Sequence, residues 1–569
     1  MFKNYLLLDN NLKNIKKSSK IIFFDEYSKN LIDKKILKKY QTSSLLNFNE
    51  LKKFNYNSNL LNKKIKKYIK EFTIILNKIH HKDYNQNYWG LILDRIFYLT
   101  INAILFELSI LKKIKKNKGK TTFKSPNFKN FFLDSFGFIQ GYEENSTQPF
   151  IRYCVAKKLG FKEENFTNEE KKTLSLNTKK SFRDFFNIKN YLVKILQLYV
   201  KIFKPFLIID GFIPKRSCIK IFLKSFGRIL ILPSNLFFIK KNNNRVKNHE
   251  VRKTLKITEN DIIDKIFNDL IYDFFPASCL ENFKEYDWYS ANFKTVPMLG
   301  TAVSLIHNDH FKYMAASIIN KGGKLIIFQH GGLIGKEKYD RDEAFNRKYS
   351  TKVFNWDGTT NFIENYFERF DKIKESSIKK NKEILILSTR TKMKYTYNQS
   401  VYKKNHPYLN DNFKFYEKLS RNIKKKTAIK LFPNKYSEIT KKIWIDKFGK
   451  NLKIINNKKN LKLFNNYKIT IIDDISTPLC ELMYVGAPFI IINNELEWLK
   501  KTTTKKIIKL KKLNMFFENP TKASKFLNKN YDNIDIWWKK NTSSNIYKDL
   551  EREIIPSKKS KSTLLNLLK

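Results

Sequence analysis

Short runs of β-branched and aliphatic residues recur along the chain, and longer stretches with helical periodicity separate them. This alternation predicts parallel sheets, because parallel strands are buried on both faces and are joined by crossover helices. The candidate strands are residues 5–8, 21–24, 206–209, 229–232, 302–306, 325–328, 352–355, 384–387, 428–431, 469–472 and 489–492. They are too many for one ordinary sheet, so we expect an α/β protein with at least two domains.

The boundary between the domains is predicted in the polar segment 357–382, which precedes a fresh apolar strand. An N-terminal Rossmann-like domain is expected over residues 1–370, with a helical insertion at about 47–117. A second Rossmann-like domain is expected over residues 371–525. The remaining residues, 526–569, are predicted to form a helical tail that packs back on the domain junction.

The formal net charge is +58, from 111 Lys and Arg against 53 Asp and Glu. Such a charge points first to nucleic acid or to an anionic membrane surface. Lysine outnumbers arginine several-fold, however, and Asn, Ile, Tyr and Phe are abundant throughout, which is typical of A- and T-rich codon usage. Nucleic-acid recognition relies on arginine and on localised basic stripes. We therefore expect no specific nucleic-acid partner, and at most peripheral attraction to an anionic membrane.

Four cysteines lie far apart without a C-x-x-C pair, which fits a reducing compartment and excludes a zinc ribbon. The N-terminus lacks the features of a secretory signal peptide. The longest apolar tract, residues 91–111, contains Asp94, Arg95 and Glu107, so it predicts a buried helix instead of a membrane span. The sequence predicts a cytoplasmic protein.

The segment QHGG follows the predicted strand 325–328 and forms the first candidate site. Ligands in open α/β sheets bind at the carboxyl ends of strands. Gly331 and Gly332 permit positive φ and close approach of a bound group, while His330 supplies an imidazole. The alternative is an ordinary strand-to-loop turn. A third glycine at Gly335 favours a ligand site, and His330 is expected to take part in catalysis.

Other enzyme classes that use glycine-rich loops are excluded because the sequence lacks the motifs that they require. The chain has no G-x-S-x-G nucleophile elbow, no G-x-x-x-x-G-K-[ST] phosphate loop, and no G-x-G-x-x-G after a strand. The hydrolase and nucleotide triphosphatase classes therefore do not fit.

A second candidate site lies where another predicted strand ends, close to Asp474. Thr477 is predicted to be the N-cap of a helix of about two turns, with the Ser476 hydroxyl beside it. A helix N-terminus with two hydroxyls is suited to phosphate. Glu481 lies outside the spacing of a capping box, so its carboxylate is available to a ribose. The alternative is a plain capped helix with a solvated glutamate.

Three further residues are candidates. Asp210 follows the predicted strand 206–209, where a carboxylate could deprotonate an acceptor hydroxyl, although a turn aspartate before glycine is the alternative. Arg390 and Lys430 follow strands of the second domain and could bind phosphate. The segment 307–310 is a poor metal-ligand set, so its Asp309 and His310 are expected to cap a helix and no metal site is predicted.

The strand, the Ser/Thr at a helix start, the glutamate and the following G-x-P resemble the donor-binding half of GT-B glycosyltransferases and of related nucleotide-sugar epimerases. Over nearly its whole length the chain is similar to the long transferases of O-antigen and other surface-polysaccharide loci. The matching segments are LNKIHHKDYNQNYWGLIL (76–93), HFKYMAASIINKGGKLIIFQHGGLIG (310–335), FNWDG (354–358), KLFPNK (430–435) and DDISTPLCELMYVGAP (473–488). One departure concerns K-x-H-P, which many sialic-acid-type enzymes use for the nucleotide and which here is KLFP.

The resemblance implies two Rossmann-type domains with a central cleft, the first for the acceptor and the second for a nucleotide-activated sugar, including the case of a CMP-linked acidic sugar. It implies transfer to a glycan or lipid-linked glycan at the inner membrane face, without a cofactor and without a metal. His330, the amides of Gly331 and Gly332, Arg390, Lys430 and the Ser476–Thr477 helix end would stabilise the departing phosphate. A non-hydrolysing epimerase and a basic polyanion-binding protein are the alternatives.

Overall fold

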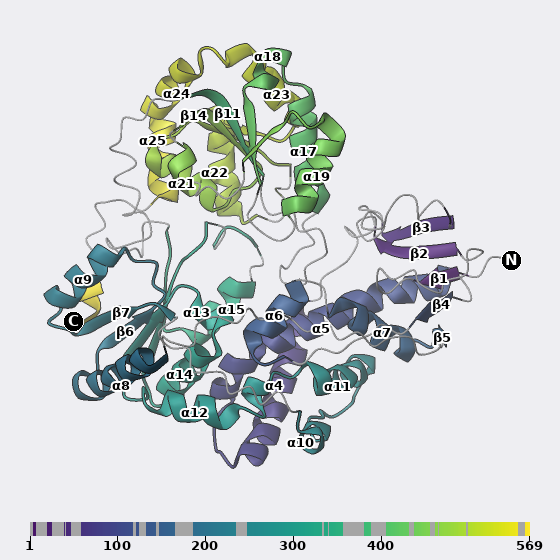
Figure 1. The fold of residues 1–569 in the computed structure, drawn as a ribbon, viewed down its shortest axis with the longest axis vertical. Helices are drawn as coiled ribbons and strands as arrows, with labels where there is room; N and C mark the ends of the chain where they lie inside the picture. Colours follow the sequence, from purple (N-terminus) through teal and green to yellow (C-terminus); the bar gives the residue numbers. More distant parts are fainter. Residues whose placement is uncertain are drawn as a thin grey trace.

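The computed structural model describes residues 4–6, 20–25, 39, 41–46, 58–117, 121–124, 132–143, 147–164, 186–234, 247–332, 335–338, 341–356, 381–388, 405–431, 437–455, 461–464, 466–494, 496, 499–555 and 564–568. Their strands form three sheets, and every strand pair in these sheets is parallel (Figure 1). The prediction of an α/β protein with parallel sheets is confirmed. The division into two domains stays a prediction.

The N-terminal sheet has the strand order β3-β2-β1-β4-β5. Its strands are β1 (Asn4–Leu6), β2 (Lys20–Asp25), β3 (Gln41–Leu46), β4 (Thr121–Lys124) and β5 (Lys162–Glu164). The sequence predicted only β1 and β2. The other three read QTSSLL, TTFK and KEE, so they lack the apolar run by which a buried strand is recognised.

The middle sheet has the order β10-β9-β8-β6-β7. Its strands are β6 (Phe206–Ile209), β7 (Ile229–Leu232), β8 (Met298–Thr301), β9 (Lys324–Phe328) and β10 (Lys352–Phe354). The predicted strand 302–306 is wrong. The Thr301 hydroxyl accepts from the backbone N–H of Ser304 at 2.9 Å, which ends β8 and begins the helical turn α13 (Ser304–His307).

The C-terminal sheet has the order β13-β12-β11-β14-β15-β16. Its strands are β11 (Asn381–Leu387), β12 (Thr427–Lys430), β13 (Lys453–Ile455), β14 (Tyr467–Ile472), β15 (Phe489–Ile492) and β16 (Phe516–Phe517). The chain order reverses between β11 and β14. The carboxyl ends of these two strands therefore flank the switch point where doubly wound sheets bind ligands.

Two long helices, α4 (Ser58–His80) and α5 (Gln86–Asn117), share one large core with the middle sheet. The two carboxylates within α5 are buried but paired: Glu107 bonds Arg152 at 2.9 Å, and Asp94 bonds Lys348 at 2.8 Å. This explains how a mostly apolar helix carries charges in a protein interior. Among the described helices, none has the length and apolar character needed to cross a bilayer.

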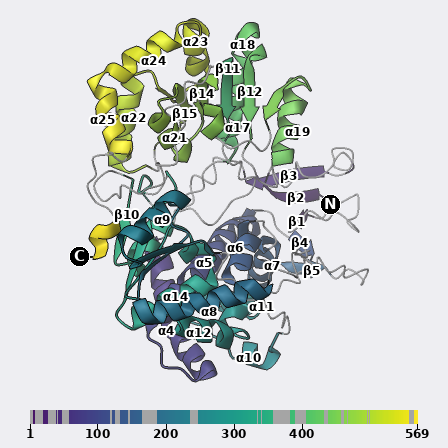
Figure 2. The same ribbon diagram turned by 60° about the vertical axis from the view of Figure 1, so that its left-hand side comes forward.

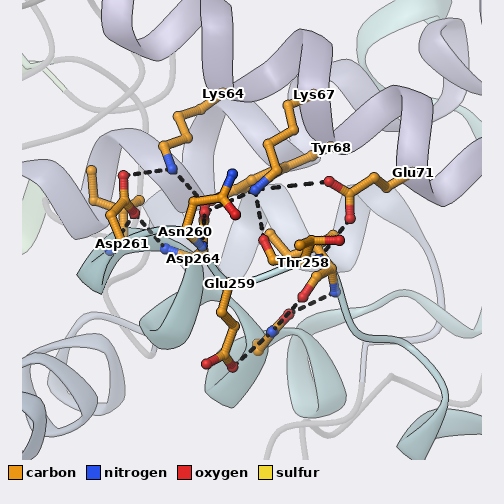
Figure 3. Close-up of polar contacts among 12 residues, drawn as sticks. Lys64, Lys67, Tyr68, Glu71, Thr258, Glu259, Asn260, Asp261 and Asp264 are labelled. Carbon is orange, nitrogen blue, oxygen red and sulfur yellow. Dashed lines mark hydrogen bonds and ion pairs between the residues drawn. The ribbon is translucent and has the colours of Figure 1, made fainter.

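A buried carboxylate fastens α4 to α11 (Ile262–Phe274), as Figure 3 shows. Asp264 accepts hydrogen bonds from Lys64 Nζ at 2.6 Å, Lys67 Nζ at 2.8 Å and the Tyr68 hydroxyl at 2.6 Å. Burial by itself would raise the pKa of Asp264, but the hydrogen bonds from these three residues outweigh it and hold the pKa below its usual value. The cluster is thus an ion pair between helices about 200 residues apart in sequence.

His80, at the end of α4, lies in an aromatic setting that disfavours its charged form. Its ring stacks on Phe283 with centroids 3.9 Å apart, and Nε2 lies 3.1 Å from the carbonyl oxygen of Cys279. Desolvation lowers the pKa of His80 to about 4. Because the folded pKa is below the unfolded value, its contribution to stability is complete above pH of about 6.5 and is lost as the pH falls toward about 4.

Replacing His80 with phenylalanine is therefore expected to flatten the decline of stability between these pH values while keeping the ring contact. The unfolding midpoint in urea, measured at several pH values, checks this. His81→Asn is the matched control, since His81 is exposed and has a φ of 53°, which asparagine tolerates. Equal pH slopes for wild type and His80→Phe would contradict the assignment.

The last helices cover the C-terminal sheet. They are α23 (Pro520–Asn530), α24 (Ile534–Ser543) and α25 (Asn545–Ile554). Trp538 and Leu550 join one core beneath this sheet, while Leu527 joins the core on the other side. The final described segment, η4 (Leu564–Leu568), packs instead against the middle sheet, where Leu564 shares a core with Phe206 and Ile221.

Candidate functional site

The loop after β9 is held by a side chain that the sequence did not single out. Gln329 is buried, and its amide Nε2 donates to the carbonyl of Gly331 at 2.7 Å. Its Oε1 accepts from the backbone N–H of Trp356 at 2.7 Å. Gln329 therefore fixes the path of the following His-Gly-Gly segment, and a glutamine directly before that segment was the available signal.

Gly332 contacts the start of the helix that follows β14 of the C-terminal sheet. Its backbone N–H donates to the Thr477 hydroxyl at 2.9 Å. A Cβ atom added at Gly332 would lie 2.5 Å from the Thr477 nitrogen and 2.7 Å from the Ser476 carbonyl oxygen. Neither Gly331 nor Gly332 has a φ in the left-handed region. The glycine is thus required by the close approach of another backbone, and positive φ plays no part.

The helix α21 (Thr477–Val485) begins one residue earlier than predicted. Ser476 is its N-cap and makes no side-chain capping bond, whereas Thr477 is its first helical residue. Gly486, with a φ of 70°, ends it as expected. Pro478 has no N–H, and the Leu479 N–H donates to the Ser476 carbonyl at 3.1 Å. The helix end therefore offers its dipole and the Ser476 hydroxyl, and few amides.

Buried polar contacts hold the end of β14. The Asp473 carboxylate accepts from the Asn412 amide at 2.8 Å, and the Asp473 carbonyl accepts from the Asn493 amide at 3.2 Å. Asp474 is less buried and accepts from the Ile475 N–H at 2.8 Å. Asp474 thus shapes the loop before α21.

Lys430 and Glu481 are both buried near the switch point. Lys430 is the last residue of β12, and Glu481 lies on α21. Burial lowers the pKa of Lys430, while the negative charge of Glu481 acts in the opposite direction. Because Thr477 and Glu481 are four residues apart, they share one face of α21. On that face, Thr477 contacts Gly332. One turn later, the charge of Glu481 acts on Lys430.

Several basic side chains lie near His307, on the middle-sheet side. The pKa of His307 is lowered, first by desolvation and then by the charges of Arg95, Lys312 and His330. His330 itself is half-buried at the end of β9. His307 is therefore neutral near pH 7, Arg95 pairs with Asp342, and Lys312 lies 3.4 Å from Asp309, so carboxylates balance much of the basic charge near the His-Gly-Gly loop.

Lys336 is a second residue that sequence reasoning missed. Its Nζ lies 3.5 Å from the Ile475 carbonyl oxygen and 3.6 Å from Cys480 Sγ. Its own carbonyl accepts from the Lys500 N–H at 2.9 Å and the Thr503 hydroxyl at 3.0 Å. The segment after the glycines thus contacts α21 and the start of the helix Lys501–Lys512, which both belong to the C-terminal part of the chain. No local motif marks Lys336, because only the packing of distant elements brings it to α21.

Asp210 has a bonded carboxylate. One oxygen accepts from the Ser234 N–H at 2.7 Å and the other from the Ser304 hydroxyl at 2.7 Å. Its φ is 52°, and its strand β6 lies two positions from β9 in the sheet. Asp210 therefore ties together the ends of neighbouring strands. Arg390 lies outside the described residues.

The segment 307–310 is structural. Asn308, and not Asp309 or His310 as expected, caps α14 (Asp309–Asn320), because its side chain accepts from the Phe311 N–H. Asp309 is buried and accepts from the Ser278 hydroxyl at 2.5 Å. No group of three or more His, Cys, Asp or Glu suited to a metal ion occurs among the residues the structure describes.

Three comparisons place the chain among known proteins. A family model described as "LIC12162 family transferase" matches residues 4–562. The comparison with curated proteins finds no match. Among solved structures, the chain is similar to a Listeria monocytogenes protein assigned as a UDP-N-acetylglucosamine 2-epimerase, at 10% identity, covering 61% of this chain and 94% of that chain. The TM-score is 0.34, so this similarity carries no argument.

Proposed function

This chain belongs to the LIC12162 family of transferases, and from that premise we propose that it transfers a sugar from a nucleotide-activated donor to a glycan acceptor during surface-polysaccharide synthesis. The donor would lie at the switch point of the C-terminal sheet, and the acceptor would approach from the middle sheet, in a GT-B arrangement. A lipid-linked glycan at the inner membrane face is the acceptor we favour.

One observation carries this proposal: residues that follow or end strands of two different sheets interact with a single face of α21. Thr477 on that face contacts Gly332, and Glu481 on the same face lies near the buried Lys430. The middle-sheet loop and the switch point of the C-terminal sheet thus converge on one helix end. A group-transfer site needs such convergence, because donor and acceptor must be held together.

The proposed roles follow from charge and position. Lys430, Lys336 and the positive end of the α21 dipole would stabilise the departing nucleoside phosphate, and Glu481 would accept from the ribose. The acceptor oxygen would attack the anomeric carbon as the bond to the phosphate oxygen breaks. The hydroxyl proton would pass to His330, which follows β9 in the same loop as Gly332, whereas Asp210 follows β6, two strands away in the sheet.

The experiment is incubation with CMP-, UDP-, GDP- and CDP-activated sugars, with and without an acceptor glycan. Consumption of one donor only when the acceptor is present supports transfer. An epimerised donor without acceptor would favour the epimerase alternative, and no reaction with any donor would count against both. Protection against thermal unfolding by one nucleotide identifies the donor class.

Glu481→Gln and Lys430→Met are expected to lower the transfer rate about a hundredfold or more, because each removes a charge at the proposed donor. Initial rates with the donor identified above measure this. Glu553→Gln is the control, since Glu553 pairs with Lys509 away from the proposed site. Wild-type rates in both site variants would refute the assignment of the donor to this switch point.

A further inference from the structure

Exposed apolar side chains are concentrated in one stretch of the chain. Among the residues that the structure describes, fourteen large hydrophobic residues are exposed, and eight of them lie between residues 195 and 226. Phe212 lies between β6 and the helix that follows it and belongs to neither helix discussed below. The remaining seven define what we name the α8–α9 surface: Ile195, Leu198, Ile202, Phe203, Ile219, Leu223 and Phe226.

These residues belong to two helices and the turn that follows the second. Helix α8 (Phe186–Phe203) precedes β6, and α9 (Lys215–Lys224) connects β6 with β7. Figure 1 shows both helices on the side of the molecule where β6 and β7 lie, and in Figure 2 this side has been turned forward. Ile195, Leu198 and Ile202 are spaced by three and four residues, so they form one stripe along α8.

Tyr199 fastens the two parts of the surface together. Its hydroxyl donates to the Gly227 carbonyl at 2.7 Å, and its ring lies 6.3 Å from that of Phe222. The end of α8 therefore lies against the turn that carries Phe226, which is 92% exposed. Side chains this apolar and this exposed rarely cluster on a protein surface without an interaction role.

The charge of this stretch is predominantly positive. Residues 186–234 contain nine Lys and Arg and a single acidic residue, Asp210, whose two oxygens already accept hydrogen bonds. Eight of the basic residues are described as exposed, and they are Lys194, Lys201, Lys204, Lys215, Arg216, Lys220, Lys224 and Arg228. Within residues 186–234, the surface therefore combines aliphatic and phenylalanine side chains with predominantly basic exposed charges.

We propose that the α8–α9 surface binds an anionic lipid bilayer, with its apolar side chains entering the boundary between headgroups and acyl chains. Basic helices with an exposed apolar stripe have this preference. A second copy of the chain fits poorly, because pairing this surface with itself would oppose like charges. Nucleic acid leaves the aliphatic stripe unexplained. None of the surface residues belongs to the proposed transfer site, so the inference does not rest on transfer activity.

The test measures co-sedimentation of the full chain with phosphatidylglycerol-containing vesicles and with pure phosphatidylcholine vesicles. The apolar variant is Ile195→Ser/Leu198→Ser/Ile202→Ser. Its control is Ile508→Ser/Ile536→Ser/Ile546→Ser, which removes three equally apolar exposed side chains from other helices. We expect the apolar variant to lower partitioning onto anionic vesicles about tenfold or more, and the control to stay within about twofold.

A second pair of variants separates a local site from the charge of the whole chain. Lys201→Gln/Lys204→Gln/Lys224→Gln is compared with Lys522→Gln/Lys525→Gln/Lys529→Gln, which removes the same charge from exposed positions on α23. The first is expected to weaken binding more than the second, and most at low salt. Equal effects within either pair, or no binding of wild type to anionic vesicles, would overturn the proposal. A change confined to self-association would overturn it in favour of a protein partner.

Discussion

Gly332→Ala is expected to lower the melting temperature and to reduce transfer at least a hundredfold. The added Cβ would meet backbone atoms of Ser476 and Thr477 at 2.5–2.7 Å, and backbone cannot move aside as a flexible side chain can. The loop must retreat from α21, at a cost of about 1–3 kcal/mol. A displacement of about 1 Å between reacting groups can by itself cost a hundredfold in rate.

The neighbouring glycine supplies the control. A Cβ at Gly331 would lie 3.9 Å from the Thr477 hydroxyl oxygen, which is ordinary contact. Gly331→Ala also keeps the backbone amide, so its melting temperature is expected to stay close to that of wild type. Differential scanning fluorimetry and initial rates on the two variants decide the question. Similar losses in both would mean that glycine is needed for loop flexibility and not for the contact with α21.

Asp264→Asn is expected to destabilise the union of α4 and α11 by about 3–5 kcal/mol, the usual cost of leaving a buried charge without its partner. Lys64 is 7% exposed and would keep only its contact with Asp261. Hydrogen exchange of the α4 and α11 amides, followed by mass spectrometry, reports this opening without assuming that the whole chain unfolds in one step.

Acid should have a similar effect on the wild-type protein. Because the folded pKa of Asp264 is depressed, its contribution to stability is present above the unfolded value of about 3.8 and is lost only as the pH falls through the folded pKa.

Asp549→Asn is the control for the Asp264→Asn variant, since the Asp549 carboxylate is 55% exposed and 3.5 Å from Arg552. That variant should change exchange by less than about 0.5 kcal/mol. Unchanged protection in Asp264→Asn would contradict a stabilising role for the cluster.

The sequence predicted most strands that form apolar runs of four or more residues and missed the polar strands, the short strands β13 and β16, and β8. Residues 206–209 and 489–492 were recognised exactly as they are because all four positions of each are buried. The polar strands β3, β4 and β5 gave no such signal, and their sheet was missed. The apolar run 302–306 was assigned to a strand because periodicity cannot separate a short buried helix from a buried strand.

Parts of the candidate site were predictable because certain residue types favour helix ends and loops. The helix α21 was predicted from Ser476, Thr477 and Gly486. A loop at a strand end was predicted from the His-Gly-Gly segment. The direct contact between Gly332 and Thr477 could not be predicted from the sequence. The same holds for the contributions of Gln329 and Lys336, because each depends on how the chain packs. Asp210 was predicted as a candidate base, with a turn aspartate as the alternative, and its hydrogen bonds to Ser234 and Ser304 could not be predicted from the sequence.

The position of η4 has a consequence for synthesis on the ribosome. Leu564 completes the core that covers one side of the middle sheet, yet it follows the last strand of that sheet by about 210 residues. At about 5–20 residues per second, this interval lasts roughly 10–40 s. During that time the nascent middle sheet exposes part of an apolar face, so it is a natural client for a chaperone until the end of the chain emerges.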